Sequence, residues 1–284
     1  MSLNRLPPLV HIYGAGKVGQ TFGLLLARHH YTIGQVICRH LQNAQKAVHL
    51  IGMGNPQTTF SPTPSPALLL LATPDQILPQ IVEQLAHYSL SNFWILHFSG
   101  SLPSTLLQPL HACGAHIASM HPLKSFAIPN DSADSFPGTF CTYEGDAEFL
   151  PLLHQLLLDL KALPCPVLTE HKAIYHAAAV VASNYLVGLL QFALELFQKA
   201  GISEKDGLPA LLLLMSGTLE NIKKVGPRKA LTGPIQRGDL STIQLHLEHL
   251  LPEDRKLYQE LGKKCLSLTP FSENQRKSIE SLLE

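Results

Sequence analysis

Short apolar runs alternate with segments of helical periodicity over the first 168 residues of the chain. This alternation predicts a parallel sheet with helices on its faces, because a helix separates most pairs of successive strands. Gly52–Pro66 is rich in Gly, Pro, Thr and Ser, which predicts a loop with a short edge strand at Thr58–Phe60. Ala127–Gly138 is a second loop-like region. The other predicted strands are Leu9–Tyr13, Ile33–Ile37, Ala67–Ala72, Phe93–Phe98, His116–Met120, Thr139–Tyr143 and Pro166–Thr169.

The pattern changes near Thr169, where the strand-like runs stop and helical periodicity continues to Leu283. Lys172–Lys199 predicts one long helix of roughly seven turns, and Gly201 is placed to end it. The predicted fold is α/β, with a doubly wound, mostly parallel sheet over residues 1–168 and an all-α domain over residues 169–284. The further helices predicted in the second domain are Leu208–Lys224, Asp239–Leu250, Glu253–Lys264 and Ser272–Leu283.

Charge and composition narrow the classes of function. Lys and Arg together number 21, as do Asp and Glu, so no net charge favours nucleic acid or an acidic membrane surface. Hydrophobic residues make up 45% of the chain and charged residues 15%, which indicates a globular protein with a large core. We therefore expect a small-molecule substrate and no nucleic-acid or membrane partner. The apolar run Ala173–Leu190 carries Tyr175, His176, Ser183 and Asn184 and predicts a buried helix rather than a membrane span.

Cysteine and histidine usage gives no sign of a metal centre. The five cysteines are scattered singly, which is typical of a reducing cytosol. The fifteen histidines include no H-E-x-x-H motif and no closely spaced Cys/His set. Residues 1–8 lack the apolar core of a signal peptide. We expect a cytoplasmic protein without a bound metal.

The first predicted strand runs directly into a G-x-G-x-x-G motif and then into a helix. In this context one glycine makes the tight turn, one lets a pyrophosphate approach the backbone, and one lets helix and strand pack closely. The N-terminus of the following helix offers free N–H groups and a positive dipole end to the anion. The motif predicts a Rossmann-like dinucleotide site at Gly14, Ala15, Gly16, Lys17, Val18 and Gly19.

The end of the second strand indicates which dinucleotide is bound. An acidic residue there would bind a ribose 2′-hydroxyl, whereas a basic residue would bind a 2′-phosphate. The chain places Arg39 and His40 at this position and no Asp or Glu. A guanidinium can pair with a phosphate through two hydrogen bonds, so we predict NADP as the cofactor.

Two later strand ends complete the predicted cofactor site. Ala72, Thr73 and Pro74 follow one strand, and Ser99 and Gly100 follow the next. Both tips lie at the carboxyl edge of the sheet, where open α/β folds bind their ligands. Thr73 and Pro74 also suit an ordinary helix start, as N-cap and first residue, and both roles can coexist.

Several motifs together resemble the oxidoreductases that join a Rossmann-like domain to a helical domain of unknown function. This resemblance covers nearly the whole chain. The chain also resembles, more distantly, pyrroline-5-carboxylate reductase and the β-hydroxyacid dehydrogenases. The resemblance implies an NADP-binding domain followed by a helical domain that often builds a dimer, so we expect a homodimer formed through that domain. The motifs are Gly14–Gly19, Ala72–Asp75, His97–Gly100, Met120–Phe126, His176–Asn184 and Leu231–Asp239.

The long helix from Lys172 carries the main catalytic candidates. Helical spacing places His176, Ser183 and two valines on one stripe, with Asn184 about 80° round from His176. In the β-hydroxyacid dehydrogenases, a Lys and an Asn of the corresponding helix act on the proton and the substrate oxygen. This chain departs from that pattern, because Lys172 is followed four residues later by His176. We predict His176 as proton donor or acceptor, Asn184 as partner of the substrate oxygen and Ser183 as a substrate contact.

Two loops supply further candidates. His121 and Lys124 follow the strand that ends at Met120, and Lys124 could bind a substrate carboxylate or phosphate. His121 is a catalytic candidate, although a histidine before proline is also a common turn residue. Thr232 and Arg237 flank a tight Gly-Pro loop and are predicted to line the cleft.

These motifs predict an NADP-dependent oxidoreductase with its active site between two domains. The reaction would be hydride transfer between the nicotinamide and a small carbonyl, imine or alcohol substrate. A different class stays open, namely a sensor that binds NADP and signals without catalysis. Within the enzymes, a deazaflavin-linked NADP oxidoreductase is a further alternative.

Overall fold

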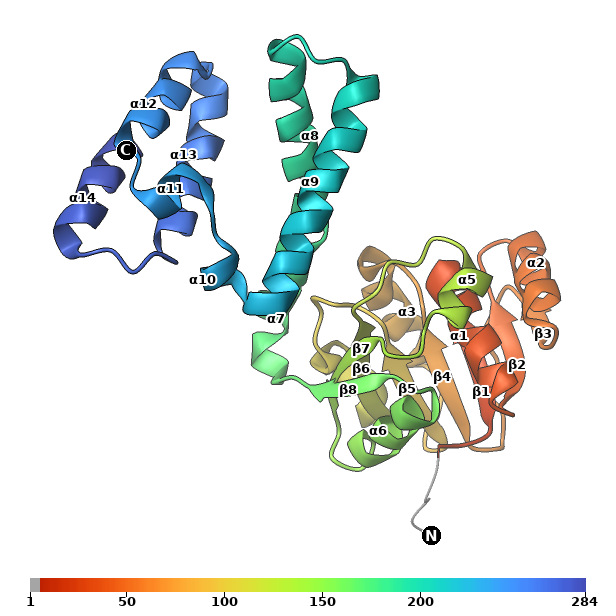
Figure 1. The fold of residues 1–284 in the computed structure, drawn as a ribbon. Coiled ribbons are helices and arrows are strands. Elements are labelled where there is room, and N and C mark those ends of the chain that lie inside the picture. The colour runs from red at the N-terminus through yellow and green to blue at the C-terminus, as the bar shows by residue number, and fades with distance from the viewer. Residues whose placement is uncertain (1–5) are drawn as a thin grey trace. The chain divides into compact units, whose positions relative to one another are not determined.

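The computed structural model describes residues 6–284, and the chain divides into two compact units. The first unit ends at Tyr185 and the second begins at Leu186. In Figure 1 the first unit runs from red to green and contains the sheet, whereas the second runs from green to blue and is helical. The predicted class, a mostly parallel α/β domain followed by a helical region, is confirmed. The predicted boundary at residue 168 lies inside the first unit, which also includes helix α7, Lys172–Ala182.

One sheet of eight strands forms the centre of the first unit. The strand order is β3-β2-β1-β4-β5-β6-β7-β8, and all neighbours are parallel except β6 and β7. The chain moves outward from β1 to β3 on one side and then continues on the other side from β4, so the order reverses between β1 and β4. Such a switch point opens a crevice at the carboxyl ends of the strands. The strands are β1 Leu9–Tyr13, β2 Thr32–Ile37, β3 Asn55–Gln57, β4 Ala67–Leu71, β5 Phe93–His97, β6 His116–Pro122, β7 Phe140–Gly145 and β8 Leu163–Pro166.

Helices cover both faces of this sheet, as the apolar residues of alternate strand positions require. Helices α1 Lys17–Arg28, α2 Leu41–Ile51, α5 Pro129–Asp134 and α6 Leu150–Asp159 pack on one face. Helices α3 Leu78–Leu85 and α4 Gln108–Ala112 pack on the other. Three 3-10 turns precede helices, at Asp75–Ile77, Ser104–Leu107 and Thr169–His171.

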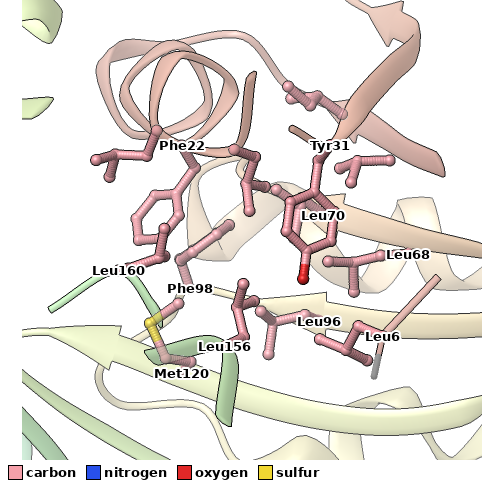
Figure 2. Packing of buried hydrophobic residues seen from close by; sticks show 14 of the residues in the cluster. Leu6, Phe22, Tyr31, Leu68, Leu70, Leu96, Phe98, Met120, Leu156 and Leu160 are labelled. Atoms are coloured by element: carbon pink, nitrogen blue, oxygen red, sulfur yellow. The ribbon is translucent and has the colours of Figure 1, made fainter. Parts of the chain in front are cut away.

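The larger of the two apolar cores lies between the sheet and α1. Figure 2 shows Phe22 of α1 beside Phe98 and Met120, and the Phe22 and Phe98 rings lie 4.5 Å apart between centroids. Phe22 is 1% exposed, and burying an aromatic side chain of this size contributes about 2 to 3 kcal/mol. This packing holds the glycine-rich turn that precedes α1 against the sheet.

Several predicted elements differ from the observed ones in position. The edge strand expected at residues 58–60 lies at β3, Asn55–Gln57, and the last strand is Leu163–Pro166 rather than residues 166–169. The loop expected at residues 127–138 contains the short helix α5. The single helix expected at residues 172–199 is wrong: α7 ends at Ala182, and α8, Asn184–Lys199, begins after Ser183. Ser183 has φ −118° and ψ −70°, which departs from helical geometry.

The second unit consists of short and medium helices with a small core. The buried residues Ile243, Leu266, Ile279 and Leu283 join its last helices. Ser203 and Ser272 cap two helices, and Ser272 forms a capping box with Gln275. After α8 the helices are α9 Glu204–Val225, α10 Pro227–Ala230, α11 Gly233–Arg237, α12 Leu240–His249, α13 Pro252–Leu266 and α14 Glu273–Leu282.

One helical stretch of residues 6–284, Thr169–Lys199, is long and apolar enough to cross a membrane by length and composition. Its most apolar window has a mean hydropathy of 1.7, and 6% of that window is buried. The prediction of a buried helix over residues 173–190 is therefore wrong for the single chain. The face of α7 that packs on its own unit carries Lys172, Tyr175 and His176, which leaves most of its apolar side chains exposed.

Candidate functional site

The glycine-rich turn is fixed by the two strands beside it. The N–H of Gly14 donates to the Ile37 carbonyl at 2.8 Å, and that of Ala72 donates to the Tyr13 carbonyl at 2.8 Å. Gly14 has φ +92°, and a Cβ there would lie 2.5 Å from Cγ2 of Thr73. A Cβ on Gly19 would lie 2.1 Å from the Gly14 carbonyl oxygen. The fold itself therefore requires glycine at both positions.

Gly16 differs from the other two glycines. A Cβ built on it meets no heavy atom within 4 Å, and its φ of −73° suits any residue. It is the N-cap of α1, where no side chain caps the helix and the first turn holds no acidic residue. No heavy atom of residues 6–284 occupies the space next to Gly16 at this helix N-terminus, whose free N–H groups favour an anion such as a pyrophosphate.

A cavity of about 970 Å³ opens beside this turn. Its walls come from the turn, the ends of β2 and β4, helix α2, the segment after β3 and helix α3. The hydroxyl of Thr73 is buried in this wall and has no hydrogen-bond partner among residues 6–284. A buried hydroxyl without a partner is costly, and a ligand oxygen in the cavity would relieve that cost. The cavity thus fits a dinucleotide in both size and donor groups.

Two cations and an amide stand at the β2 end of the cavity. Arg39 follows β2, while Asn43 and Lys46 lie on the first turns of α2, and all three side chains line the cavity from exposed positions. His40 is the N-cap of α2 and does not line the cavity. Asn43 and Lys46 were absent from the sequence prediction, although both follow Arg39 within two turns of helix.

The remaining residues of the predicted cofactor site fall into two groups. Ala15, Thr73 and Pro74 line the cavity together with Gly14 and Gly16. Lys17, Val18 and Gly19 open helix α1, and Ala72 ends β4, without lining it. Ser99 and Gly100 lie apart from the cavity at the tip of β5.

Asp75 joins the cavity to the tip of β5. It follows Pro74, and its carboxylate accepts hydrogen bonds from the Ser99 hydroxyl at 2.7 Å and the Ser101 hydroxyl at 3.1 Å. The Ser99 oxygen in turn accepts from the Leu102 N–H at 2.9 Å. These bonds hold two adjacent strand ends in one arrangement, so the cavity wall and the β5 tip form a continuous polar edge.

A buried lysine ties helix α7 to this edge. Nζ of Lys172 donates to the Ser99 carbonyl at 2.8 Å and to the Ser119 hydroxyl, and it lies 3.9 Å from Oε1 of Glu144. Glu144 accepts two bonds from Ser104, at 2.7 and 2.6 Å. Lys172 is 2% exposed and Glu144 3%, so both charges depend on these partners rather than on water.

Burial lowers the pKa of Lys172 to about 8, and the opposing influence of Glu144 and Asp75 is smaller. An amine with such a pKa exchanges protons closer to neutral pH than an exposed lysine does. Lys172 also orients its helix. Tyr175 and His176 lie three and four residues later on the same face of α7.

Two imidazoles meet at Gly100. The ring centroids of His121 and His176 are 5.3 Å apart and the planes cross at 81°. A Cβ on Gly100 would lie 2.2 Å from Nδ1 of His176 and 3.0 Å from Nε2 of His121. The Nδ1 of His176 is buried and has no hydrogen-bond partner within the described part of the chain. The glycine at the β5 tip thus leaves room for both rings.

The electrostatic setting keeps the His121 imidazole neutral. Burial lowers the pKa of His121 to about 4, aided by the charges of His176 and Lys172 and opposed by Asp75. Burial also lowers the pKa of His97, at the end of β5, to about 4. At neutral pH the group facing Gly100 from β6 is therefore an uncharged imidazole with a single N–H.

The structure brings His121, His176, Ser99 and Gly100 together but places the other predicted residues elsewhere. Ser183 and Asn184 are exposed at the break between α7 and α8, and their side chains make no hydrogen bond within residues 6–284. The stripe and the 80° offset assumed one continuous helix, so that geometric basis is lost. Lys124 donates to the Ser135 carbonyl at 3.1 Å.

Thr232 and Arg237 belong to the second unit. Thr232 is the N-cap of α11, and Arg237 lies 3.8 Å from Asp239 and lines a small cavity of about 160 Å³. Within residues 6–284, no group of three or more His, Cys, Asp or Glu residues is placed to hold a metal ion.

The polar side chains that meet around Ser99 and Gly100 at the β5 tip form a polar cluster. Sequence reasoning missed four of its members: Asp75, Ser119, Glu144 and Tyr175. The spacing Lys172, Tyr175, His176 was a visible signal, because these positions share a helix face. Ser119 and Glu144 carried no such signal. They meet through the antiparallel register of β6 and β7, which pairs Ser119 with Glu144.

Comparisons with known proteins agree with this architecture. A model of a Rossmann-like domain matches residues 3–122, and a model of a domain of unknown function, DUF2520, matches residues 139–265. The chain carries these two domains in this order. The resemblance to oxidoreductases that join such a pair is confirmed, and the Rossmann-like domain implies a nicotinamide dinucleotide.

Solved structures share the fold over nearly the whole chain. BF3122 from Bacteroides fragilis, which carries the provisional name NADP oxidoreductase, is 21% identical, with a TM-score of 0.72, and covers 91% of this chain and 98% of its own. A reductive aminase from Aspergillus terreus in complex with NADPH is 19% identical, with a TM-score of 0.58 and coverage of 96% and 91%. A pyrroline-5-carboxylate reductase from Coxiella burnetii is 13% identical, with a TM-score of 0.59 and coverage of 97% and 98%. At these identities the likeness concerns the fold. Among curated proteins, none matches the chain.

Proposed function

We propose that this chain is an oxidoreductase that binds NADP and transfers a hydride between the nicotinamide and a small carbonyl, imine or alcohol. The observation that carries this proposal is the space at Gly16, an uncapped helix N-terminus that no heavy atom of the described residues 6–284 fills. NADP, when bound, supplies the hydride chemistry. The names of the structural neighbours, which include NADP- and NADPH-linked enzymes, support the same class.

In this proposal the residues around the cavity hold the cofactor. The N–H groups at Gly16 receive the pyrophosphate, and the unpartnered Thr73 hydroxyl offers one further hydrogen bond. Arg39 and Lys46 bind the 2′-phosphate, because no carboxylate stands at the end of β2 to receive a ribose hydroxyl instead. This arrangement favours NADP over NAD.

The polar cluster at the β5 tip holds and moves the proton. His176 is the first candidate for proton donor or acceptor, since its Nδ1 is buried without a partner beside Gly100. His121 is the second, as a neutral imidazole that faces the same glycine. Lys172 sets the orientation of α7 and, with its lowered pKa, can return a proton to either ring near neutral pH.

The other roles remain as predicted from the sequence. Asn184 and Ser183 are proposed to contact the substrate oxygen, Lys124 a substrate anion, and Thr232 and Arg237 the substrate. His40 is proposed to assist Arg39 at the phosphate. Lys124 bonds to the Ser135 carbonyl, and the side chains of Ser183 and Asn184 make no hydrogen bond within residues 6–284, so these residues rank below His176 and His121 as targets for mutation.

The test is a titration with NADPH and NADH, followed by turnover assays with small ketones, imines and alcohols. His176→Ala is expected to reduce kcat by about 100-fold or more while the affinity for NADPH stays within a factor of two. Unchanged turnover in this variant would contradict the assignment. Tight NADPH binding without turnover of any carbonyl or imine would favour a sensor.

We also propose that the apolar surface of α8 and α9 pairs with a second copy of the chain. Helices α8 and α9 bury Leu194 and Leu211, yet Val187, Leu213 and Leu214 are 69%, 77% and 65% exposed. A lipid partner is less suited, since α9 carries six charged side chains, which are costly within a bilayer core. The five free cysteines fit the cytoplasmic location that we propose for the pair.

Light scattering tests the pairing. The wild-type chain is expected to have twice the monomer mass, and Leu213→Glu is expected to give the monomer. Leu257→Glu, on an exposed leucine of α13, serves as the matched control and is expected to stay paired. A monomeric wild-type protein would overturn the proposal.

A further inference from the structure

The two ring nitrogens of His121 face different partners. Its Nδ1 lies 2.8 Å from the hydroxyl oxygen of Tyr175, and the two rings meet edge to face with centroids 5.8 Å apart. Its Nε2 is the atom nearest to Gly100 from this ring, 3.0 Å from the position of a Cβ there. One nitrogen is therefore bonded to helix α7, and the other is directed at the β5 tip.

A neutral imidazole carries one proton, and the hydrogen bond at one nitrogen decides where that proton resides. Burial holds the pKa of His121 near 4, so the ring is neutral above pH 5. If Tyr175 donates to Nδ1, the proton lies on Nε2 and points to Gly100. If Tyr175 accepts from Nδ1, the Nε2 lone pair faces Gly100 instead.

The surroundings of Tyr175 favour donation. Burial raises the pKa of its phenol, so the hydroxyl keeps its proton at neutral pH. A phenol O–H is a stronger acid than the N–H of a neutral imidazole, and an imidazole nitrogen is a stronger base than a phenol oxygen, so the phenol donates to Nδ1 across the 2.8 Å contact. The Thr142 side chain is a second hydrogen-bond partner of the phenol.

We propose that Tyr175 is a positioning residue that holds His121 in the Nε2–H tautomer, with the N–H directed at Gly100 beside His176. This inference rests on the proposed function for its role in turnover, where the N–H would donate to the substrate oxygen or nitrogen. The chain Thr142, Tyr175, His121 runs from β7 through α7 to β6. It uses no residue of the cofactor cavity.

The chain contains two other tyrosine–histidine hydrogen bonds, which lie in different surroundings. Nδ1 of His246 lies 2.8 Å from the Tyr258 hydroxyl, with ring centroids 5.8 Å apart, and Tyr143 lies 2.7 Å from Nδ1 of His154. The bond itself is therefore not special to the site. His121 differs because its second nitrogen faces another imidazole at a buried glycine.

The tautomer is measured by long-range proton–nitrogen correlation on the full chain labelled with ¹⁵N-histidine, at pH 7.5 and without cofactor. His121→Gln assigns the signal. The wild-type protein is expected to show a protonated Nε2 and an unprotonated Nδ1 at His121. Tyr175→Phe is expected to move this signal toward a mixture of tautomers. Tyr258→Phe is expected to change His246 and leave His121 unaltered.

A proton on Nδ1 of His121 in the wild-type protein, or an unchanged tautomer in a folded Tyr175→Phe protein, would overturn the inference. If Tyr175→Phe does not fold, the wild-type tautomer decides the question. The spectra need no turnover, so failure of the proposed function leaves this result separate. Where turnover is found, Tyr175→Phe is expected to lower kcat about 10- to 100-fold with unchanged affinity for NADPH.

Discussion

Nζ of Lys172 donates a 2.8 Å hydrogen bond to the backbone carbonyl of Ser99, so the first turn of α7 is fixed to the tip of β5. The same amine bonds to Ser119 and lies beside Glu144. Because α7 starts from this anchor, the next residues on its face, Tyr175 and His176, reach His121 and Gly100. The buried ion pair thus positions the polar cluster as well as stabilising the first unit.

Replacing Lys172 by Met is expected to destabilise the first unit by about 3 to 5 kcal/mol, because it leaves the Glu144 charge buried without its cation. Urea unfolding followed by fluorescence reports this unit, since Trp94 of β5 is the only tryptophan in the chain. Arg28→Met removes an exposed ion pair with Asp134 of the same unit and is the matched control, with little expected change. Equal effects of the two variants would show that the buried pair does not anchor α7.

Gly16→Ala is expected to lower the affinity for NADPH without lowering the stability of the fold. The added methyl meets no heavy atom within 4 Å in the part of the chain that the structure describes, so the melting temperature without ligand is expected to stay within about 2 °C of wild type. The methyl fills the space assigned to the pyrophosphate, and NADPH affinity is expected to fall by at least 10-fold. Gly19→Ala, whose Cβ would lie 2.1 Å from a carbonyl oxygen, is expected to destabilise the fold itself. An unchanged affinity in Gly16→Ala would remove the pyrophosphate from this turn.

Arg39→Ser is expected to weaken NADPH binding about 10- to 100-fold, since a hydrogen bond to a charged group contributes about 1.5 to 3 kcal/mol. NADH lacks the 2′-phosphate, so its affinity in the same variant is expected to change less than about twofold. Lys46→Ala is expected to act in the same direction with a smaller loss. Calorimetric titration of both nucleotides checks this difference. Parallel losses for NADPH and NADH would place Arg39 away from the phosphate.

His11 contributes to the stability of the first unit at neutral pH. It is 1% exposed in β1, its Nδ1 accepts from the Gln35 N–H at 2.9 Å, and burial lowers its pKa from 6.5 to about 4. Between these values the unfolded chain binds more protons than the folded chain, so stability falls as the pH drops from 6.5 to 4. The difference corresponds to about 3 kcal/mol.

His11→Asn keeps an acceptor for Gln35 and cannot be protonated. Its free energy of unfolding, measured by Trp94 fluorescence, is expected to depend less on pH between 4 and 6.5 than that of the wild-type chain. Part of the acid destabilisation should remain, because His97 and His121 also have pKa values lowered to about 4. His49→Asn, at an exposed position of α2, should leave the pH dependence unaltered. If the free energy of unfolding of His11→Asn fell with pH between 6.5 and 4 as steeply as that of the wild-type chain, the lowered pKa of His11 would be contradicted.

The central strands of the sheet could be predicted from local sequence, whereas its edge strands could not. β1 lies at the predicted residues, and β4 and β5 each differ by a residue, because continuous apolar runs between turn residues identify buried strands. β3 and β8 were misplaced by a few residues, since edge strands with prolines carry little apolar pattern. The break at Ser183 was missed because the apolar helical pattern continues through Ser183 and Asn184, although both are weak helix formers.

The cofactor turn could be predicted from local sequence, whereas the polar cluster could not. Glycines at this spacing between a strand and a helix are typical of a turn that binds a dinucleotide phosphate. The meeting of Lys172, Glu144 and Ser119 depends on strand register and on how a helix returns to the sheet, which no local pattern records. His176 was predicted from spacing along a helix that proved shorter, yet it reached the cluster because it lies one turn from Lys172.

Titration of the purified wild-type chain with NADPH and NADH decides whether Gly16 and Arg39 form an NADP site. We expect saturable NADPH binding, at least 10-fold tighter than NADH. We also expect the melting temperature to rise with NADPH concentration, as it does for a ligand of the folded state. Absence of binding, or equal affinity for the two nucleotides, would contradict an NADP site at Gly16 and Arg39.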